Sequence, residues 1–337
     1  MKKFTVFSDL QVHNYKKFDV KGSRLNNCLE VFNDVFEFNH NEGIDLCLFI
    51  GDLYDSQKDL PTVVVNSVVN RLSTLFKKYP EQRLVAISGN HDYATKNLID
   101  KPAETALQHL AEIFPGRFIL LDNKIKFFQM DGVDLFIQGI PYYEYKEHYQ
   151  TRLEQSKEEL SEYIHEMYSD GGYGPNPVYK TILLIHQTPE HSNAMIPFDT
   201  KVEDPLYKNY DLILCGHIHK HEVLKQNFII VGSPIHRDLS DAGQDKGFMV
   251  YDDASDLDSF EIIYLDKYPK YKQERNPDPD STDYVIPIIE IEDSPEVEVQ
   301  TKQFVASNKR EDLVENYWNE VGEGNENLLK LGLKFIS

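Results

Sequence analysis

The sequence contains few cysteines, and their number excludes a protein that is held together by disulfides. Only Cys28, Cys47 and Cys215 occur among 337 residues, so all three cannot pair. Two of them lie inside or beside apolar runs that we expect to be core strands. Buried free thiols are typical of a reducing compartment, so we expect a cytoplasmic protein.

Long apolar stretches are also missing. No run approaches the ~20 residues that a membrane-spanning helix needs. The apolar run after Met1-Lys2-Lys3 is too short for a signal peptide, so we expect no association with a membrane. The chain is nevertheless 41% hydrophobic and 12% aromatic, which excludes wholesale disorder, and its length allows one large domain and a small one.

Basic residues are outnumbered by acidic ones. The chain has 35 Lys and Arg against 56 Asp and Glu, which gives a formal net charge of −21. A protein that binds nucleic acid through its phosphates usually carries a basic face. Only two short segments, 220–225 and 267–275, gather enough lysine to form a local basic strip. An ordinary solvated loop is the alternative explanation for both.

Five short apolar runs end in groups that can bind a metal. Runs rich in Val, Ile, Leu and Phe that stop at Gly or Asp indicate buried strands, and α/β proteins place their chemistry at strand ends. One such ending means little, but five in one chain indicate a site. The runs are Phe4–Phe7 before Asp9, Leu46–Ile50 before Asp52, Leu84–Ile87 before Asn90 and His91, Ile182–Ile185 before His186, and Leu212–Leu214 before His217 and His219.

The types of ligand indicate a centre of two ions. Mixed oxygen and nitrogen donors without a cysteine pair suit Mn, Fe or Zn better than Ca or a thiolate-bound structural zinc. Six or seven ligands are too many for one catalytic ion, but they suit two ions that share a carboxylate. Asp52 is the natural bridge because each of its oxygens can bind one ion. His217 and His219 are two residues apart, so an extended backbone would point both imidazoles to one side.

Each of these residues also has a simpler explanation when it is taken alone. Asp9 could cap a helix, and Gly51-Asp52 could be an ordinary turn. That structural explanation has to hold five times in one chain, so we prefer a shared metal site.

The motifs resemble those of the calcineurin-like metallophosphoesterases, in the same order and over about residues 1–250. The resemblance implies an α/β fold, a sandwich of two mixed sheets face to face, with helices outside and metals at the strand ends. The motifs are Asp9, Gly51-Asp52-Leu53-Tyr54-Asp55, Gly89-Asn90-His91-Asp92, His186 and Gly216-His217-Ile218-His219.

Two later segments are similar to the end of the catalytic domain in SbcD-type DNA nucleases. They are Val231-Gly232-Ser233-Pro234-Ile235 and Lys246-Gly247-Phe248. These nucleases are subunits of SMC-like repair and recombination complexes, including compact phage versions that work in the host cytoplasm. The resemblance implies a metal-dependent exonuclease or endonuclease that hydrolyses DNA phosphodiesters in repair, recombination or end processing. It also implies a coiled-coil SMC-like ATPase partner and a homodimer.

The resemblance to the metallophosphoesterases further implies a role for each site residue. His91 would lie beside the scissile phosphate and donate a proton or a hydrogen bond, and Asp55 would orient His91. The cofactors would be two divalent ions, Mn²⁺ or alternatively Mg²⁺. Asp9, Asp52 and His219 would hold one ion, and Asp52, Asn90, His186 and His217 would hold the other.

The first motif departs from the family pattern. The family usually has Asp-x-His, whereas here Asp9 is followed by Leu10, Gln11, Val12 and His13. Gln11 could coordinate through its amide oxygen, or His13 could reach the site in its place. We favour Gln11, with His13 nearby, and we expect a weaker site than an imidazole would give.

The sequence predicts a division near residue 267. The charged segment 267–283 contains three prolines and no hydrophobic periodicity, which is typical of a linker. It would join a nuclease domain, 1–266, to a small capping domain, 284–337. The capping domain would be a β-α-β unit that begins with a strand at Tyr284–Ile291, in which Pro287 favours an edge position. A helix around Trp318 and a strand through Leu331 and Phe335 would follow.

Two other functions remain open from the sequence. One is a different phosphoesterase activity, on nucleotides or phosphoproteins, which would use the same ligands. The other is a weakly catalytic DNA-binding scaffold, for which Gln11 is the only hint. The acidic charge also predicts weak DNA binding by the chain alone, with a basic partner supplying much of the affinity.

Overall fold

The computed structural model describes residues 3–16, 19, 23–169, 178–192, 199–274 and 281–287. The chain divides into two compact units, Met1–Ile288 and Ile289–Ser337. All described residues belong to the first unit. The helix and the last strand that we expect in the capping domain lie outside the described residues.

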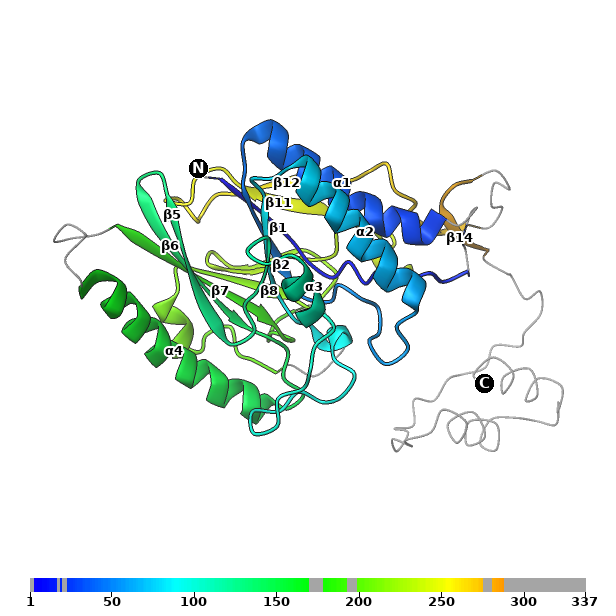
Figure 1. Ribbon diagram of the computed structural model, residues 1–337. Helices are drawn as coiled ribbons and strands as arrows, with labels where there is room; N and C mark the ends of the chain where they lie inside the picture. The colour runs from blue at the N-terminus through cyan, green and yellow to red at the C-terminus, as the bar shows by residue number, and fades with distance from the viewer. Residues whose placement is uncertain are drawn as a thin grey trace, which may run out of the picture. The chain divides into compact units, whose positions relative to one another are not determined.

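Two six-stranded mixed sheets form the body of the first unit, and all five expected strands are present (Figure 1). The α/β sandwich that the sequence predicts is therefore confirmed. The first sheet has the order β12 (Glu261–Tyr264), β11 (Gly247–Tyr251), β1 (Phe4–Phe7), β2 (Leu46–Ile50), β3 (Arg83–Ile87) and β4 (Phe118–Leu120). The second has the order β5 (Lys124–Met130), β6 (Val133–Ile140), β7 (Tyr179–His186), β8 (Leu212–Gly216), β10 (Phe228–Ile230) and β9 (Glu222–Lys225).

An apolar layer fills the space between the two sheets. Leu48 and Ile50 of β2 belong to the same buried cluster as Leu184 of β7 and Leu214 of β8. Successive side chains of a strand point to opposite faces, so the intervening Phe49 packs in a different cluster, with residues of the helices. Both faces of these strands are therefore buried, which explains why their sequences lack polar alternation.

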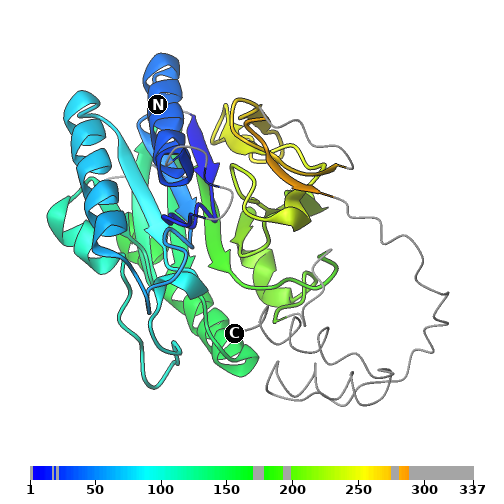
Figure 2. The same cartoon turned by 90° about the vertical axis from the view of Figure 1, so that its right-hand side faces the viewer.

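Helices cover the outer face of each sheet. α1 (Ser23–Glu42) and α2 (Thr62–Lys78) lie side by side over the first sheet, as Figure 2 shows. α4 (Lys146–Ser169) packs on the second sheet, and a short α3 (Gln108–Ile113) precedes β4. No helix in the described part of the chain is long and apolar enough to cross a membrane.

The segment that we expect to be a linker contributes to the first unit. β13 (Tyr271–Glu274) pairs in parallel with β14 (Tyr284–Pro287). Tyr268 is buried, and its hydroxyl donates to a carboxylate oxygen of Asp34 in α1 at 2.5 Å. The guanidinium of Arg24, also in α1, lies 5.0 Å from the centre of the Tyr284 ring. The compact unit therefore extends to Ile288, beyond the boundary expected at residue 266.

The three cysteines are free and buried, as the sequence predicts. Burial raises the pKa of Cys47 to about 12, although side-chain hydrogen bonds oppose the effect. Its thiol therefore stays protonated, and it acts as a small apolar residue of the core.

The substitution Leu48→Ala should lower the free energy of unfolding by about 2–5 kcal/mol, because it leaves a cavity between the sheets. Denaturant titration would measure the loss. Val63→Ala in α2 is the control, because Val63 is 51% exposed and a surface change of this kind costs no more than about 0.5 kcal/mol. Equal effects of the two substitutions would contradict the placement of Leu48 in the core.

Candidate metal centre

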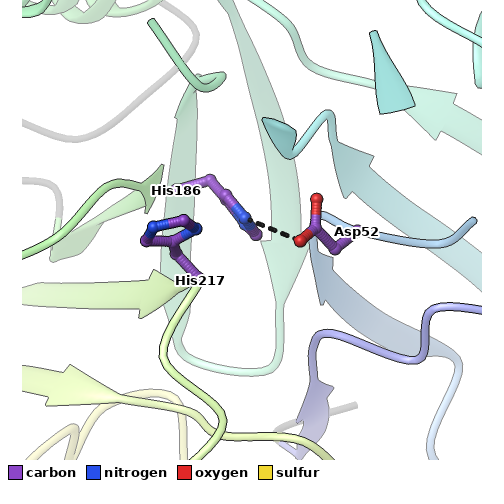
Figure 3. A group of neighbouring side chains, drawn as sticks. All are labelled: Asp52, His186 and His217. Carbon is purple, nitrogen blue, oxygen red and sulfur yellow. Dashed lines mark ion pairs between the residues drawn. The ribbon is translucent and has the colours of Figure 1, made fainter. Parts of the chain in front are cut away.

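The candidate ligands meet because their strands end at one edge of the sandwich. β1, β2 and β3 are parallel neighbours in the first sheet, and β7 and β8 are parallel neighbours in the second. The two edges are joined directly, since His186 Nδ1 lies 2.7 Å from the main-chain oxygen of Ile50. Figure 3 shows the result, with Asp52 from the first sheet facing His186 and His217 from the second.

The backbone adopts an unusual conformation at several candidate ligands. Asp9, Gln11, Asp52 and His217 have φ values of 52°, 42°, 57° and 81°. Positive φ is uncommon for residues other than glycine, and each such residue costs on the order of 1–3 kcal/mol. The described chain has six non-glycine residues of this kind, and four are candidate ligands. Conformational strain is thus concentrated at the site, where the chain turns after β1, β2 and β8.

Four side chains form the tighter part of the site. His186 Nε2 lies 3.4 Å from Asp52 Oδ2 and 3.2 Å from Asn90 Oδ1. His217 Nδ1 lies 2.8 Å from the same oxygen of Asn90. The ligand atoms of Asp52, His186 and His217 all lie within 4.8 Å of one another. Two imidazoles, one carboxylate and one amide oxygen thus converge, a set that suits a divalent transition metal.

The charges of this group depend on one another. Burial by itself would lower the pKa of His186, but the Asp52 carboxylate outweighs burial and raises it to about 9. Burial would raise the pKa of Asp52, but His186 outweighs this effect and holds that pKa well below its ordinary value. Burial, with the nearby charge of His186, lowers the pKa of His217 to about 3. A neutral His217 keeps the form of imidazole that binds metals.

Asp92, the last residue of the Gly89–Asp92 motif, holds the neighbouring loops together. Its buried carboxylate accepts hydrogen bonds from the main-chain nitrogens of Gly89 and Asp52, both at 2.9 Å, and from those of Leu53 at 3.1 Å and Tyr54 at 3.2 Å. A Cβ atom on Gly89 would lie 2.1 Å from Asp52 Oδ1, so only glycine lets the loop approach so closely. Asp92 is therefore a positioning residue for Asp52.

Asp9, Gln11 and His219 lie beside the four side chains of the tighter part of the site. Gln11 Nε2 donates to Asp52 Oδ2 at 3.2 Å and lies 3.3 Å from His219 Nε2. Both carboxylate oxygens of Asp9 accept from the main-chain nitrogen of His217 at 3.1 Å. The structure therefore brings all seven expected ligands together.

The orientation of Gln11 differs from the expected one. Its amide oxygen accepts hydrogen bonds from Nη2 and Nε of Arg237, at 3.0 and 3.2 Å. The N–H groups, and not the oxygen, are thus directed toward Asp52 and His219. The buried guanidinium of Arg237 is the physical reason, because it offers only donors.

His13 does not reach the ligand group. Its Nδ1 lies 2.8 Å from the main-chain oxygen of Gln11, and its Nε2 accepts from Nε of Arg24 at 3.0 Å. Burial and the nearby charge of Arg237 lower the pKa of His13 to about 4, so the ring is neutral. Both ring nitrogens are used to hold the first motif in place.

His91 is more accessible to solvent than His186. Its side chain is 38% exposed, against 0% for His186. Its Nε2 lies 4.0 Å from Asp52 Oδ2, and its main-chain nitrogen donates to Asp52 Oδ1 at 2.8 Å. Its Nδ1 contacts the main-chain oxygen of Asp55, whereas the Asp55 carboxylate contacts Arg237 and Tyr15. Asp55 therefore holds His91 through its main chain, and not through the carboxylate as we expected.

Three residues that contribute to the site were not predicted from the sequence. Arg237 contacts Gln11, and Lys246 donates to the main-chain oxygen of His219 at 2.7 Å. The ring of Tyr142 lies 5.8 Å from that of His217. Arg237 and Lys246 lie in or between the two segments that resemble SbcD-type nucleases, which could have drawn attention to them. Tyr142 follows a strand but belongs to no motif, so no local signal marks it.

Comparisons with known proteins identify the family of the chain. A family model described as calcineurin-like phosphoesterase matches residues 2–221. None of the curated proteins matches the chain. Among solved structures, the chain is similar to a dimetal phosphatase from Danio rerio, with 11% identity, a TM-score of 0.45, and coverage of 74% of this chain and 91% of that one. It is also similar to the purple acid phosphatase PPD1 from yellow lupin (Lupinus luteus) seeds, with 14% identity, a TM-score of 0.41, and coverage of 74% and 48%. The match over most of the described residues, together with the site, establishes that the chain belongs to the calcineurin-like phosphoesterase family.

Proposed function

We propose that the chain is a metal-dependent nuclease that hydrolyses phosphodiesters in DNA. This proposal rests on the position of segment 231–248, whose motifs resemble those of SbcD-type nucleases. The main-chain nitrogen of Ser233 and the Nζ of Lys246 both donate to the main-chain oxygen of His219, at 2.9 and 2.7 Å. Segment 231–248, on which the nuclease resemblance rests, thus holds the main chain of the candidate ligand His219.

The proposed centre holds two divalent ions that share Asp52, Mn²⁺ or alternatively Mg²⁺. The residues fit such ions, because carboxylate and amide oxygens are combined with imidazoles. Asp9 and Asp52 also place two carboxylates in the interior, 0% and 1% exposed, where negative charge needs a nearby cation. One ion would be held by Asp9, Asp52 and His219, and the other by Asp52, Asn90, His186 and His217.

His91 would act on the phosphate. When bound, the two ions supply Lewis-acid polarisation of the phosphodiester and activation of water. The main-chain oxygen of Asp55 can only accept, so Nδ1 of His91 carries a proton and Nε2 is the nitrogen available to a substrate. In its protonated form, His91 would donate from Nε2 to a phosphate oxygen or to the leaving oxygen.

The described lysines of the two basic strips that the sequence suggests are paired with carboxylates. Each of these five lysines lies within 4.0 Å of a carboxylate oxygen, so they offer little free positive charge to DNA phosphates. The pairs are Lys220–Glu222, Lys225–Glu203, Lys267–Asp34, Lys270–Asp266 and Lys272–Asp283. We infer that a basic partner, such as an SMC-like ATPase subunit, supplies much of the affinity for DNA, and that the chain acts as a homodimer.

The purified chain with Mn²⁺ should shorten end-labelled linear duplex or single-stranded DNA, seen on a denaturing gel. It should also hydrolyse bis-p-nitrophenyl phosphate faster than p-nitrophenyl phosphate, because the proposed substrate is a diester. Asp52→Asn, which keeps the size of the side chain, is the inactive control. Hydrolysis of the monoester without any cleavage of DNA would identify a phosphatase instead, and DNA binding without hydrolysis would identify a scaffold.

Asp52→Ala should abolish hydrolysis and remove both ions, because one carboxylate serves both. Elemental analysis after dialysis against Mn²⁺ would measure the ions bound per chain. Asp211→Ala is a suitable control, since Asp211 precedes β8 at the end opposite His217. Two ions still bound to the Asp52 variant would refute the bridge.

His91→Ala should lower the rate of DNA hydrolysis by about 10²–10⁴, the usual contribution of general acid catalysis. Its metal content should stay near that of the unmodified chain, because His91 is not among the proposed ligands. His40→Ala, in an exposed part of α1, should change neither quantity. Loss of metal from the His91 variant would make His91 a ligand and overturn its assignment.

A further inference from the structure

Gln11 presents the wrong atoms for a metal ligand. A ligand at this position would direct a lone pair toward Asp52 and His219, which belong to the proposed ligands of the first ion. Instead Nε2 donates to Asp52 Oδ2 at 3.2 Å and lies 3.3 Å from His219 Nε2. An amide nitrogen has no lone pair to offer a metal. As the structure has it, Gln11 therefore does not fit the first ion.

Arg237 holds the amide in this orientation. Two of its guanidinium nitrogens donate to Gln11 Oε1, at 3.0 and 3.2 Å. Turning the amide over would set its N–H groups against those of Arg237. The same turn would place its oxygen against the carboxylate of Asp52. Arginine does not lose its proton in proteins, so the chain itself cannot relieve this clash.

Arg237 is itself fixed by its surroundings. Its side chain is only 5% exposed, and Nη2 also donates to Asp55 Oδ1 at 3.2 Å. Its main-chain nitrogen donates to the buried carboxylate of Asp241 at 2.6 Å, and that carboxylate pairs with Lys246 at 2.6 Å. Lys246 in turn donates to the main-chain oxygen of His219. One segment, 237–246, thus fixes both Gln11 and His219.

We propose that Arg237 is a positioning residue that withholds Gln11 from the first ion, so that the two metal sites differ in affinity. The site with Asn90, His186 and His217 binds its ion tightly. The site with Asp9 and His219 has one protein ligand fewer and binds its ion weakly. Activity then rises with the concentration of free Mn²⁺ as the weaker site fills. This inference rests on the proposed ligands of the nuclease.

Isothermal titration of the metal-free chain with Mn²⁺ tests the inference, with the electron paramagnetic resonance of bound Mn²⁺ as a second readout. The unmodified chain should bind one ion tightly and a second at least roughly 10-fold more weakly. In Gln11→Glu, one oxygen can stay on Arg237 while the other faces the ion. The weaker site should therefore tighten by about 10–100-fold, the size of effect known for groups that support metal ligands. Gln108→Glu, an exposed position in α3, adds the same charge and should leave both affinities unchanged.

Gln11→Leu separates this inference from direct coordination by Gln11. The leucine removes both the amide oxygen and the blocking N–H groups, so the affinity of the weaker site should stay constant or rise. A fall in that affinity would mean that Gln11 coordinates the ion, and it would overturn the inference. Arg237→Leu should tighten the weaker site by releasing the amide. If that variant does not fold, the two Gln11 variants decide the question.

The outcomes also distinguish this inference from the proposed function. Two equally tight ions in the unmodified chain would overturn the inference and leave the nuclease proposal intact. Binding of no ion by any variant would overturn the proposed metal centre and the inference with it. One tight and one weak ion in a chain that does not cleave DNA would support the inference and contradict only the choice of substrate.

Discussion

The site depends on the packing of two sheets across one apolar layer. Leu48 and Ile50 of β2 meet Leu184 and Leu214 of the opposite sheet, and this contact sets the distance between the sheets. It also brings the main-chain oxygen of Ile50 within 2.7 Å of His186 Nδ1. The ligands come from both sheets, so no single strand or loop could assemble them. The cost of positive φ at four of them is offset by the stability of this core.

Buried charge is the second constraint on the molecule. The site gathers carboxylates in the interior, and the chain places basic side chains beside them. Arg237 lies against Asp55 at 3.2 Å, and Lys246 lies against Asp241 at 2.6 Å. A buried charge without a partner is strongly destabilising, so these pairs limit how the segment around His219 can move. The two halves of the site also differ in their neighbours, since the guanidinium of Arg237 lies beside Gln11, whereas the imidazoles of His186 and His217 lie beside Asn90.

The charges on the outer surface are arranged differently from those at the site. The described lysines of segments 220–225 and 267–275 pair with carboxylates, and the whole chain carries a net charge of −21. A net negative charge of this size weakens the electrostatic attraction of a polyanion to the chain as a whole.

The sequence by itself predicted the five strands that precede the candidate ligands, the α/β class and the types of candidate ligand. It could do so because buried strands need continuous apolar runs and because metals select particular donor atoms. Only the tertiary structure decided which atom of Gln11 faces the site, since its partner Arg237 lies 226 positions away in the chain. The tertiary structure likewise placed Nδ1 of His91 against the main-chain oxygen of Asp55. It also placed Tyr268, in the segment without hydrophobic periodicity, against Asp34 of α1. The direction of a hydrogen bond depends on groups that folding brings together, and no local pattern encodes it.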